Sequence, residues 1–585
     1  MKIYASLLAV AGLATALEIP KHTYKCVDGV CVQSPIAERG VTPGALGLRM
    51  CEMTCGAGSL WPYPSTISLG SAVQAINLNR VSVQINGAES ASRLTGAIGK
   101  AFTDAVLAKG RTAGASTESF GRGEGLVITA TIASSTEALS TETDESYELS
   151  IDGPKVKINA ATVYGYRHAL TTLNQLIDYD DISDSVKIVN KVSIQDKPAY
   201  SHRGIVLDTA RNYYSIESLR RLIDTMAANK LNTFHWHFSD SSSFPFELKS
   251  EPRLTTYGAY SRDQIYTLDQ IRELVQFAKS RGVRIIPELD APSHAGAGWQ
   301  WGPKAGYGEL TLCYGSDPWM DYCLEPPCGQ LNPLNAHVYD ILKAVFAELH
   351  SLFDDDVFHM GGDEVSVPCW NSTKTITDHI KDTSTNAPFF ELWGDFQLKA
   401  GEYIEKANKK IMVWTSDLTT DAYLKYFKPK NTIVQLWGGS TDGDAARLTS
   451  KGFSVVASYY DAYYLDCGFG GWVSKGNGWC APYKSWQVIY DLDVRANLTE
   501  ASAKLMLGSE VAMWSEIADE RAVEAKIWPR AAALAERLWT NPKTNWKNAM
   551  SRMRIQRDRI ADAGIGTDAV HPHWCRQNPG KCTLV

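Results

Sequence analysis

The chain has 585 residues, more than one hydrophobic core can organise, so two or more domains are expected. Hydrophobic residues make up 44% and charged residues 21%, a balance typical of globular proteins and unlike that of disordered chains. The net charge of −7 gives no general attraction to nucleic acid or to anionic membranes, so neither is an expected partner.

Residues 1–16 have the pattern of a secretory signal peptide. An apolar stretch, Ile3 to Leu13, is followed by Ala14-Thr15-Ala16, which favours cleavage after Ala16. No later segment reaches the roughly 18 uninterrupted apolar residues that would span a bilayer. Twelve cysteines, an even number without a zinc-ligand pattern, favour disulfides in an oxidising compartment. Two glycosylation sequons agree with secretion; they begin at Asn371 and Asn497.

Residues 17–197 are predicted to form a small α+β domain. Segments 81–85 and 147–151 alternate apolar and polar residues, as half-buried strands do. Segments 90–107 and 164–177 have the spacing of helices. This part of the chain has no chemical motif of its own.

Residues 198–585 repeat a strand, loop and helix rhythm. Most of the candidate strands are continuous apolar runs, as expected for strands buried on both faces. Eight such units favour an α/β fold, a (β/α)8 TIM barrel that follows the α+β domain. The candidate strands are 204–208, 233–237, 283–288, 357–360, 410–414, 432–437, 453–457 and 508–513, and helices are predicted at 215–229, 268–280 and 334–353.

Polar and aromatic residues follow the predicted strands at the end where a barrel of this kind has its active site. One such residue alone has an ordinary explanation, since an Asp there often caps a helix and a Trp often packs in the barrel. Eight strand ends that all carry such residues favour a functional site. In chain order they are Asp208 to Arg211, Asp240, Asp290 to His294, Asp363-Glu364, Trp414, Trp437, Tyr464 to Asp466, and Trp514 to Glu516.

The acid pair Asp363-Glu364 is the most informative of these segments. Two adjacent carboxylates repel, so one proton is held more tightly than usual, and such a group can serve as a general acid. An Asp-Glu pair in an ordinary polar loop is the alternative. Together with tryptophan walls for a sugar ring, these acids suit hydrolysis of a glycoside.

The motifs resemble those of glycoside hydrolase family 20, the β-N-acetylhexosaminidases. His359-Met360-Gly361-Gly362-Asp363-Glu364 matches the family signature H-x-G-G-D-E, and 208–213, 235–237, 528–531 and 535–539 match further family blocks. The segments 323–330 and 476–480 are most similar to the arthropod subgroup that degrades chitooligosaccharides. The similarity extends over nearly the whole mature chain.

The resemblance implies a retaining mechanism in which the substrate's own 2-acetamido oxygen attacks the anomeric carbon and forms an oxazolinium intermediate. Glu364 would be the general acid and then the base. Asp363 would bind the acetamido N–H, and Tyr464 would hold the acetamido oxygen. Asp240 and His294 would form a charge relay that tunes Glu364.

Further residues are assigned by the same resemblance. Arg211, Asp466 and Glu516 would bind sugar hydroxyls, while Trp414, Trp437 and Trp514 would enclose the terminal N-acetylglucosamine. Trp479 and Glu325 would form the +1 subsite, where Leu324 replaces a Val of a similar enzyme and leaves chain-length preference open. The implied disulfides are Cys313–Cys369, Cys323–Cys328, Cys467–Cys480 and Cys575–Cys582, and the pairing of Cys26, Cys31, Cys51 and Cys55 stays open.

Two alternatives accompany this hypothesis. The enzyme alternative is a broader hexosaminidase that trims N-glycans or glycolipids, with lysosomes as an alternative location. The Trp479–Glu325 pair favours chitin fragments instead. A non-catalytic sugar-binding protein would have lost an acid or Tyr464, and both acids and the tyrosine are present. No cofactor or metal is expected. Oligomeric state is open, although related enzymes are commonly dimers.

Overall fold

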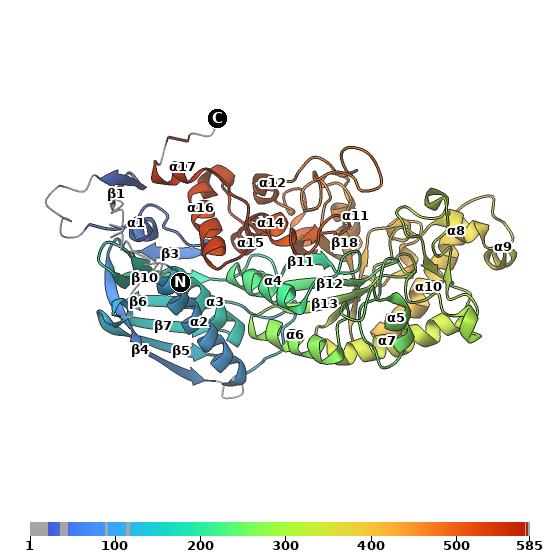
Figure 1. The fold of residues 1–585 in the computed structure, drawn as a ribbon, viewed down its shortest axis with the longest axis horizontal. Coiled ribbons are helices and arrows are strands. Elements are labelled where there is room, and N and C mark those ends of the chain that lie inside the picture. Colours follow the sequence, from blue (N-terminus) through green and yellow to red (C-terminus); the bar gives the residue numbers. More distant parts are fainter. Residues whose placement is uncertain (1–21, 35–44, 88–91, 113–117, 579–580, 583–585) are drawn as a thin grey trace, which may run out of the picture.

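The computed structural model describes residues 22–34, 45–87, 92–112, 118–578 and 581–582. The predicted signal peptide lies outside these residues. Two parts of the chain follow one another in Figure 1: a sheet domain in blue and teal, and a barrel in green to red. The predicted boundary at residue 197 falls in the connection between the last strand of the sheet and the first strand of the barrel.

The N-terminal part is an eight-stranded sheet in the order β3-β10-β6-β7-β5-β4-β9-β8. Helices α2 (Ser92–Thr112) and α3 (Val163–Gln175) contribute to the same buried core. Helix α3 ends two residues earlier than expected, because Ile177 already pairs with Ile188 of the neighbouring strand. The strands are β3 Thr66–Leu69, β4 Val73–Gly87, β5 Glu124–Ile132, β6 Tyr147–Asp152, β7 Lys155–Ala160, β8 Ile177–Asp180, β9 Ser185–Val189 and β10 Lys191–Asp196.

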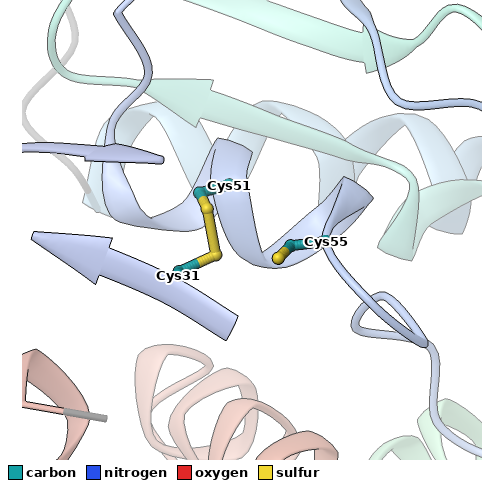
Figure 2. Close-up of side chains that lie close together, drawn as sticks. All are labelled: Cys31, Cys51 and Cys55. Carbon is teal, nitrogen blue, oxygen red and sulfur yellow. A yellow bond between two sulfur atoms is a disulfide. The ribbon is translucent and has the colours of Figure 1, made fainter. Parts of the chain in front are cut away.

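A small disulfide-linked unit precedes this sheet. Strands β1 (Thr23–Val27) and β2 (Val30–Ser34) form an antiparallel hairpin against helix α1 (Leu48–Thr54). The pairing that the sequence left open is Cys26–Cys55 and Cys31–Cys51, and Figure 2 shows how Cys31 of the hairpin reaches Cys51 on the helix. Two disulfides therefore fix a unit that is too small for a core of its own.

The C-terminal part is a closed barrel of eight parallel strands, one for each predicted strand. The last strand begins at Met506, two residues before the predicted start. Every residue of β11 and β12 is buried, as expected for strands covered on both sides. The strands are β11 His202–Asp208, β12 Thr233–Ser239, β13 Arg284–Leu289, β16 Val357–His359, β17 Lys410–Trp414, β18 Thr432–Leu436, β19 Ser454–Ala457 and β20 Met506–Met513.

Helices lie between the barrel strands and after the last one, and the local sequence determines the residue at which each helix begins. Helix α6, for example, begins at a capping box in which Thr267 and Gln270 satisfy each other's backbone N–H groups. The helices are α4 Ile216–Ala228, α5 Pro252–Gly258, α6 Leu268–Ser280, α7 Ala336–Leu352, α8 Val367–Ser372, α9 Lys374–Ile380, α10 Ala387–Glu405, α11 Asp444–Ser450, α12 Trp486–Asp491, α13 Glu500–Leu505, α14 Val523–Ile527, α15 Arg530–Thr540, α16 Trp546–Asp562 and α17 His573–Gln577. Among the described helices, none combines the length and apolar character needed to cross a membrane.

Two long connections enlarge the carboxyl-terminal end of the barrel. The one after β13 runs to α7 and contains the two-stranded ladder β14 (Thr311–Leu312) and β15 (Gln330–Leu331). The other runs from β19 to α12. Both contain predicted site residues, so the loops that depart most from a minimal barrel surround the site.

The C-terminal helices lie against helix α1 of the disulfide-linked unit. Figure 1 shows the red helices α16 and α17 close to α1. Arg576 of α17 pairs with Glu52 of α1 at 2.6 Å, and Arg49 pairs with Asp562 of α16 at the same distance. The sheet domain and the barrel are thus joined by the C-terminal helices as well as by the short connection at residue 197.

Candidate active site

The backbone after β16 turns sharply and carries the acid pair into the mouth of the barrel. Gly361 and Gly362 have φ values of 61° and 80°, and Glu364 itself has a φ of 48°. A Cβ on Gly361 would lie 1.9 Å from Asp290 Oδ1, so only glycine fits there. The same Asp290 oxygen accepts the Gly362 N–H at 2.8 Å. Gly361 therefore makes room for Asp290, and Gly362 donates a hydrogen bond to it; the sequence placed Asp290 at a strand end but assigned it no role.

Glu364 is in contact with the predicted relay. Its Oε2 lies 3.2 Å from His294 Nε2, and His294 Nδ1 lies 3.2 Å from Asp240 Oδ2. Burial alone would lower the pKa of His294, but Asp240 and Glu364 together raise it well above its ordinary value. The imidazole is therefore held as a cation beside Glu364.

Asp363 lies in a different electrostatic environment from Glu364. Burial, and then the charges of Asp290 and Glu364, raise the pKa of Asp363 well above its ordinary value, although His294 opposes the effect. Its Oδ1 atom is buried and has no hydrogen-bond partner among the described residues. A buried acceptor without a partner is costly in a folded protein and marks a place where a ligand can bind.

Aromatic side chains from four strand ends form the walls. Tyr464 is buried and lies edge-on to Trp514 and Trp479, with ring centroids 6.2 Å and 6.1 Å apart. Trp437 is edge-on to Trp479 at 6.4 Å. Trp414 is only 1% exposed and packs 5.8 Å from Trp514, so it supports the wall from beneath. Trp479 is 69% exposed and stands at the outer edge.

Two more predicted carboxylates are half-buried, and neither forms an ion pair within 4.0 Å among the described residues. Burial raises the pKa of Asp466 to about 7 and that of Glu516 to about 8. The Oδ1 atom of Asp466 has no hydrogen-bond partner among the described residues. Both groups thus offer hydrogen-bonding capacity to an incoming polar ligand.

Arg211 is held by acids on several sides. Its guanidinium lies 2.9 Å from Asp240 and 3.5 Å from Asp208, and it also pairs with Glu325. Glu325, predicted for the outer subsite, therefore reaches the residue predicted to hold the inner sugar. Spacing in the sequence contained no sign of this contact, because the two residues are 114 positions apart.

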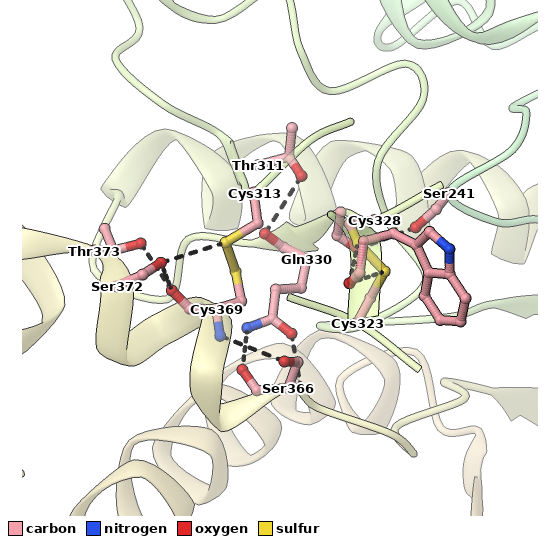
Figure 3. The surroundings of a disulfide bond; sticks show 12 residues. Ser241, Thr311, Cys313, Cys323, Cys328, Gln330, Ser366, Cys369, Ser372 and Thr373 are labelled. Carbon is pink, nitrogen blue, oxygen red and sulfur yellow. Dashed lines mark hydrogen bonds between the residues drawn. A yellow bond between two sulfur atoms is a disulfide. The ribbon is translucent and has the colours of Figure 1, made fainter. Parts of the chain in front are cut away.

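Disulfides fasten the loop that carries Glu325. Cys323–Cys328 closes its tip, and Cys313–Cys369 ties its base to helix α8, just beyond the acid pair. Figure 3 shows Gln330 between these bonds, exchanging two hydrogen bonds with the backbone of Ser366 at 2.9 Å and 3.0 Å. The remaining implied pairs, Cys467–Cys480 and Cys575–Cys582, are also formed.

A cavity of about 460 Å³ opens between these residues. Its lining includes most of the predicted site residues, and adds His237, Asp290, Trp472 and Val473. Leu324 stands at its edge and is 65% exposed. A larger cavity, about 580 Å³, lies where α2 and α3 meet the barrel helices, and none of the predicted site residues lines it. The predicted glycosylation sites Asn371 and Asn497 are both exposed.

Several clusters in the described part of the chain have the residue types of a metal site, and one of the buried ones lies inside the barrel. His235, Glu288 and His359 place potential ligand atoms within 4.8 Å of one another. Burial alone would lower the pKa of His235, but Glu510 and Glu288 on its two sides raise it to about 9. A protonated imidazole has no free lone pair for a metal, so these residues fit an internal ion-pair network better.

Comparisons with known proteins agree with this geometry. The description "Glycosyl hydrolase family 20, catalytic domain" matches residues 200–542, and "beta-acetyl hexosaminidase like" matches residues 60–176. A chitooligosaccharidolytic β-N-acetylglucosaminidase of Ostrinia furnacalis is 42% identical, over 97% of both chains. The β subunit of human β-hexosaminidase is 32% identical over 77% of this chain and 76% of its own.

A solved structure resembles the whole arrangement. The chitobiase of Flavobacterium johnsoniae matches with a TM-score of 0.68 and 27% identity, covering 87% of this chain and 73% of its own. The catalytic-domain match alone spans more than half of the chain. The chain therefore belongs to glycosyl hydrolase family 20.

Proposed function

We propose that the protein is an exo-acting β-N-acetylhexosaminidase that releases terminal N-acetylglucosamine from chitooligosaccharides with retention of configuration. The unpartnered Oδ1 of Asp363, buried beside Glu364 in the cavity that Tyr464 also lines, is the observation that supports it most directly. An acid in this position suits a substrate that brings its own nucleophile, the 2-acetamido oxygen.

Asp363 and Tyr464 orient that nucleophile. Asp363 accepts the acetamido N–H and stabilises the positive charge that develops on the nitrogen as the oxazolinium ring closes. Burial raises the pKa of Tyr464 well above its ordinary value, so its phenol stays protonated and donates a hydrogen bond to the acetamido oxygen. Both interactions strengthen as the oxygen approaches the anomeric carbon.

Glu364 transfers the proton. In its acid form it protonates the leaving oxygen, and in its carboxylate form it takes a proton from the water that opens the oxazolinium ring. His294, charged and 3.2 Å away, stabilises the carboxylate form through its contact with Asp240. Retention follows because the anomeric carbon is attacked twice, once by the substrate and once by water.

The other residues that line the cavity select the sugar. Asp466 and Glu516 accept hydroxyl protons, and Arg211 donates to a hydroxyl oxygen. Trp514 and Trp437 cover the faces of the ring, with Trp414 behind them. These contacts hold a single terminal residue and support exo action.

Trp479 supports linear chains of N-acetylglucosamine as substrates. It is 69% exposed at the edge of the cavity, where an aromatic face can stack on the next sugar. The relative from Ostrinia furnacalis, 42% identical, is a chitooligosaccharidolytic β-N-acetylglucosaminidase. Secretion is part of the proposal, on the strength of the first 16 residues, the exposed sequons and six disulfides among the described residues.

Hydrolysis of an aryl β-N-acetylglucosaminide tests the function. Glu364→Gln keeps the shape but cannot transfer the proton, and we expect kcat/KM to fall by about 10² to 10⁴. Glu391→Gln is the matched control, because this acid lies on α10 and pairs with Lys425. An active wild type whose Glu364→Gln variant hydrolyses at the same rate contradicts the assignment.

A comparison of substrates separates the two enzyme hypotheses. Turnover of chitobiose and chitotriose is measured beside turnover of a branched N-glycan with terminal N-acetylglucosamine. Faster turnover of the linear chains is expected, since only they extend along Trp479. Preference for the branched glycan would favour the broader hexosaminidase.

A further inference from the structure

Beneath the candidate site, the barrel interior contains a buried network of histidines and carboxylates. Glu288, on β13, is its centre, and it is fully buried. Three imidazoles surround it: Nδ1 of His237 at 2.7 Å, Nε2 of His235 at 2.9 Å and Nδ1 of His359 at 3.2 Å. Burial alone would raise the pKa of Glu288, but these histidines lower it well below the ordinary value. Glu288 is therefore an ionised carboxylate inside the barrel.

One oxygen of Glu288 holds the wall of the sugar site. Its Oε1 accepts the indole N–H of Trp414 at 2.7 Å. Trp414 in turn packs 5.8 Å from Trp514, which lines the cavity. The orientation of the aromatic wall thus depends on a hydrogen bond to Glu288.

The other oxygen connects to the proton-transfer group. Oε2 lies 2.7 Å from His237 Nδ1, and His237 Nε2 lies 3.1 Å from Asp240 Oδ2. Burial alone would lower the pKa of His237, but Glu288 and Asp240 raise it well above its ordinary value. Both imidazole nitrogens are then protonated and donate, one to each carboxylate. Asp240 continues to His294 and Glu364.

We propose that Glu288 is a positioning residue. Through Trp414 it orients the tryptophan wall of the sugar site, and through His237 and Asp240 it orients Glu364, the group that transfers the proton. The inference rests on the proposed function, because it assigns a role in that reaction. Glu288 does not itself line the cavity and acts through these two neighbours.

The alternative is that Glu288 only stabilises the barrel core, and Glu510 provides the matched control for it. Glu510, on β20, is equally buried, and its carboxylate accepts from His235 at 2.9 Å and Gln435 at 2.8 Å and contacts His202. In the described part of the chain, the hydrogen bonds and ion pairs of Glu510 involve neither Trp414 nor His237. Neutralising either acid removes one buried charge from the same network, but only Glu288 is joined to the wall and to the relay.

The first experiment compares Glu288→Gln with Glu510→Gln on two aryl β-N-acetylglucosaminides, one with a nitrophenol leaving group and one with unsubstituted phenol. A good leaving group needs little protonation, so damage to the acid is seen mainly with phenol. We expect Glu288→Gln to lose at least about tenfold more kcat/KM on the phenyl than on the nitrophenyl substrate. We expect equal, smaller losses on both substrates for Glu510→Gln.

A second pair of variants separates the two sides of Glu288 if Glu288→Gln does not fold. Trp414→Phe removes the indole N–H, and we expect a raised KM with the leaving-group dependence of the wild type. His237→Gln breaks the link to Asp240, and we expect a loss of kcat that is greater for phenol. Glu288→Asp keeps the charge and is expected to recover part of the activity.

The outcomes distinguish the inference from the function on which it rests. Equal losses for Glu288→Gln and Glu510→Gln on both substrates, with an active wild type, overturn the positioning role alone. The same holds if Trp414→Phe and His237→Gln change KM and leaving-group dependence in the same way. A wild type that hydrolyses neither substrate contradicts the proposed function, and with it the inference.

Discussion

Buried charges at the junction of the two domains have partners, whereas several of those at the mouth of the barrel do not. At the junction, Glu145 of the sheet domain accepts two hydrogen bonds from Arg203 of β11, at 2.7 Å and 2.9 Å, and contacts His168 at 2.9 Å. Lys230 pairs with Asp196 at 3.0 Å in the same way. At the mouth, Asp363 and Asp466 each keep an oxygen with no partner among the described residues.

The pKa shifts follow this difference. Burial alone would raise the pKa of Glu145, but Arg203 and His168 bring it well below its ordinary value. Burial raises the pKa of Asp363, Asp466 and Glu516, and nearby cations oppose the shift only in part: His294 beside Asp363, Arg530 beside Asp466 and Arg211 beside Glu516. The junction thus stabilises the fold, while the mouth keeps hydrogen-bonding capacity for a ligand at a cost in stability.

Breaking a pair at the junction should have the largest effect on stability. Arg203→Met leaves Glu145 buried with its main countercharge removed, and we expect a loss of about 3–5 kcal/mol in the free energy of unfolding. Urea unfolding measures it, and kcat at 25 °C should stay near the wild-type value. Arg281→Met is the control, since it breaks a surface pair with Asp224 worth less than about 1 kcal/mol. A loss no larger than that of the control would remove the contrast between the regions.

The opposite pattern is expected at the mouth. Asp363→Asn keeps the size of the side chain but weakens its hold on the acetamido N–H, so kcat/KM should fall by at least about a hundredfold, or 2.7 kcal/mol. The melting temperature should not decrease, because the variant removes a poorly solvated acid. Kinetics and thermal unfolding on the same sample test both parts. A destabilised variant with normal kinetics would assign Asp363 to the fold instead.

Trp479 should affect only longer substrates. Trp479→Ala removes an exposed face at the edge of the cavity, and we expect about a tenfold loss of kcat/KM on chitotriose, equal to 1.4 kcal/mol. An aryl monosaccharide substrate, which does not extend along this residue, serves as the internal reference. Equal losses on both substrates would place the effect of Trp479 at the terminal sugar.

The pH dependence of stability should show the smallest effect. The folded-state pKa of Glu516 is raised to about 8, while an unfolded Glu titrates near 4.3. Its contribution is therefore fully present below about pH 4 and is lost as the pH rises to about 8. Glu516→Gln should match the wild type at pH 4 and melt about 2 °C higher at pH 8. A melting difference that is the same at both pH values would contradict the raised pKa.

The sequence predicted the architecture because strand burial and strand-end chemistry are local patterns. Continuous apolar runs marked the eight strands, and the acids and aromatics after them marked the end of the barrel where the candidate site lies. Depth was not predictable in this way: Trp414 and Trp437 both end a strand, yet Trp414 lies behind the wall and Trp437 lines the cavity.

Contacts between residues far apart in the chain were the second feature that the sequence did not predict. The fit of Asp290 against Gly361 joins residues 71 positions apart, and Glu288 meets Trp414 across 126 positions. The glycine pair hinted at a close approach, but its partner is visible only in three dimensions. The same is true of the first four cysteines, whose pairing depends on how the hairpin lies against α1.

Replacing the acetyl group of an aryl β-N-acetylglucosaminide by trifluoroacetyl tests the substrate-assisted mechanism most directly. Fluorine withdraws electrons from the amide oxygen, which makes it a weaker nucleophile while the leaving group stays the same. If this oxygen attacks the anomeric carbon, kcat/KM should fall by at least about tenfold, or 1.4 kcal/mol. An unchanged kcat/KM would contradict substrate assistance and would require a nucleophile from the protein.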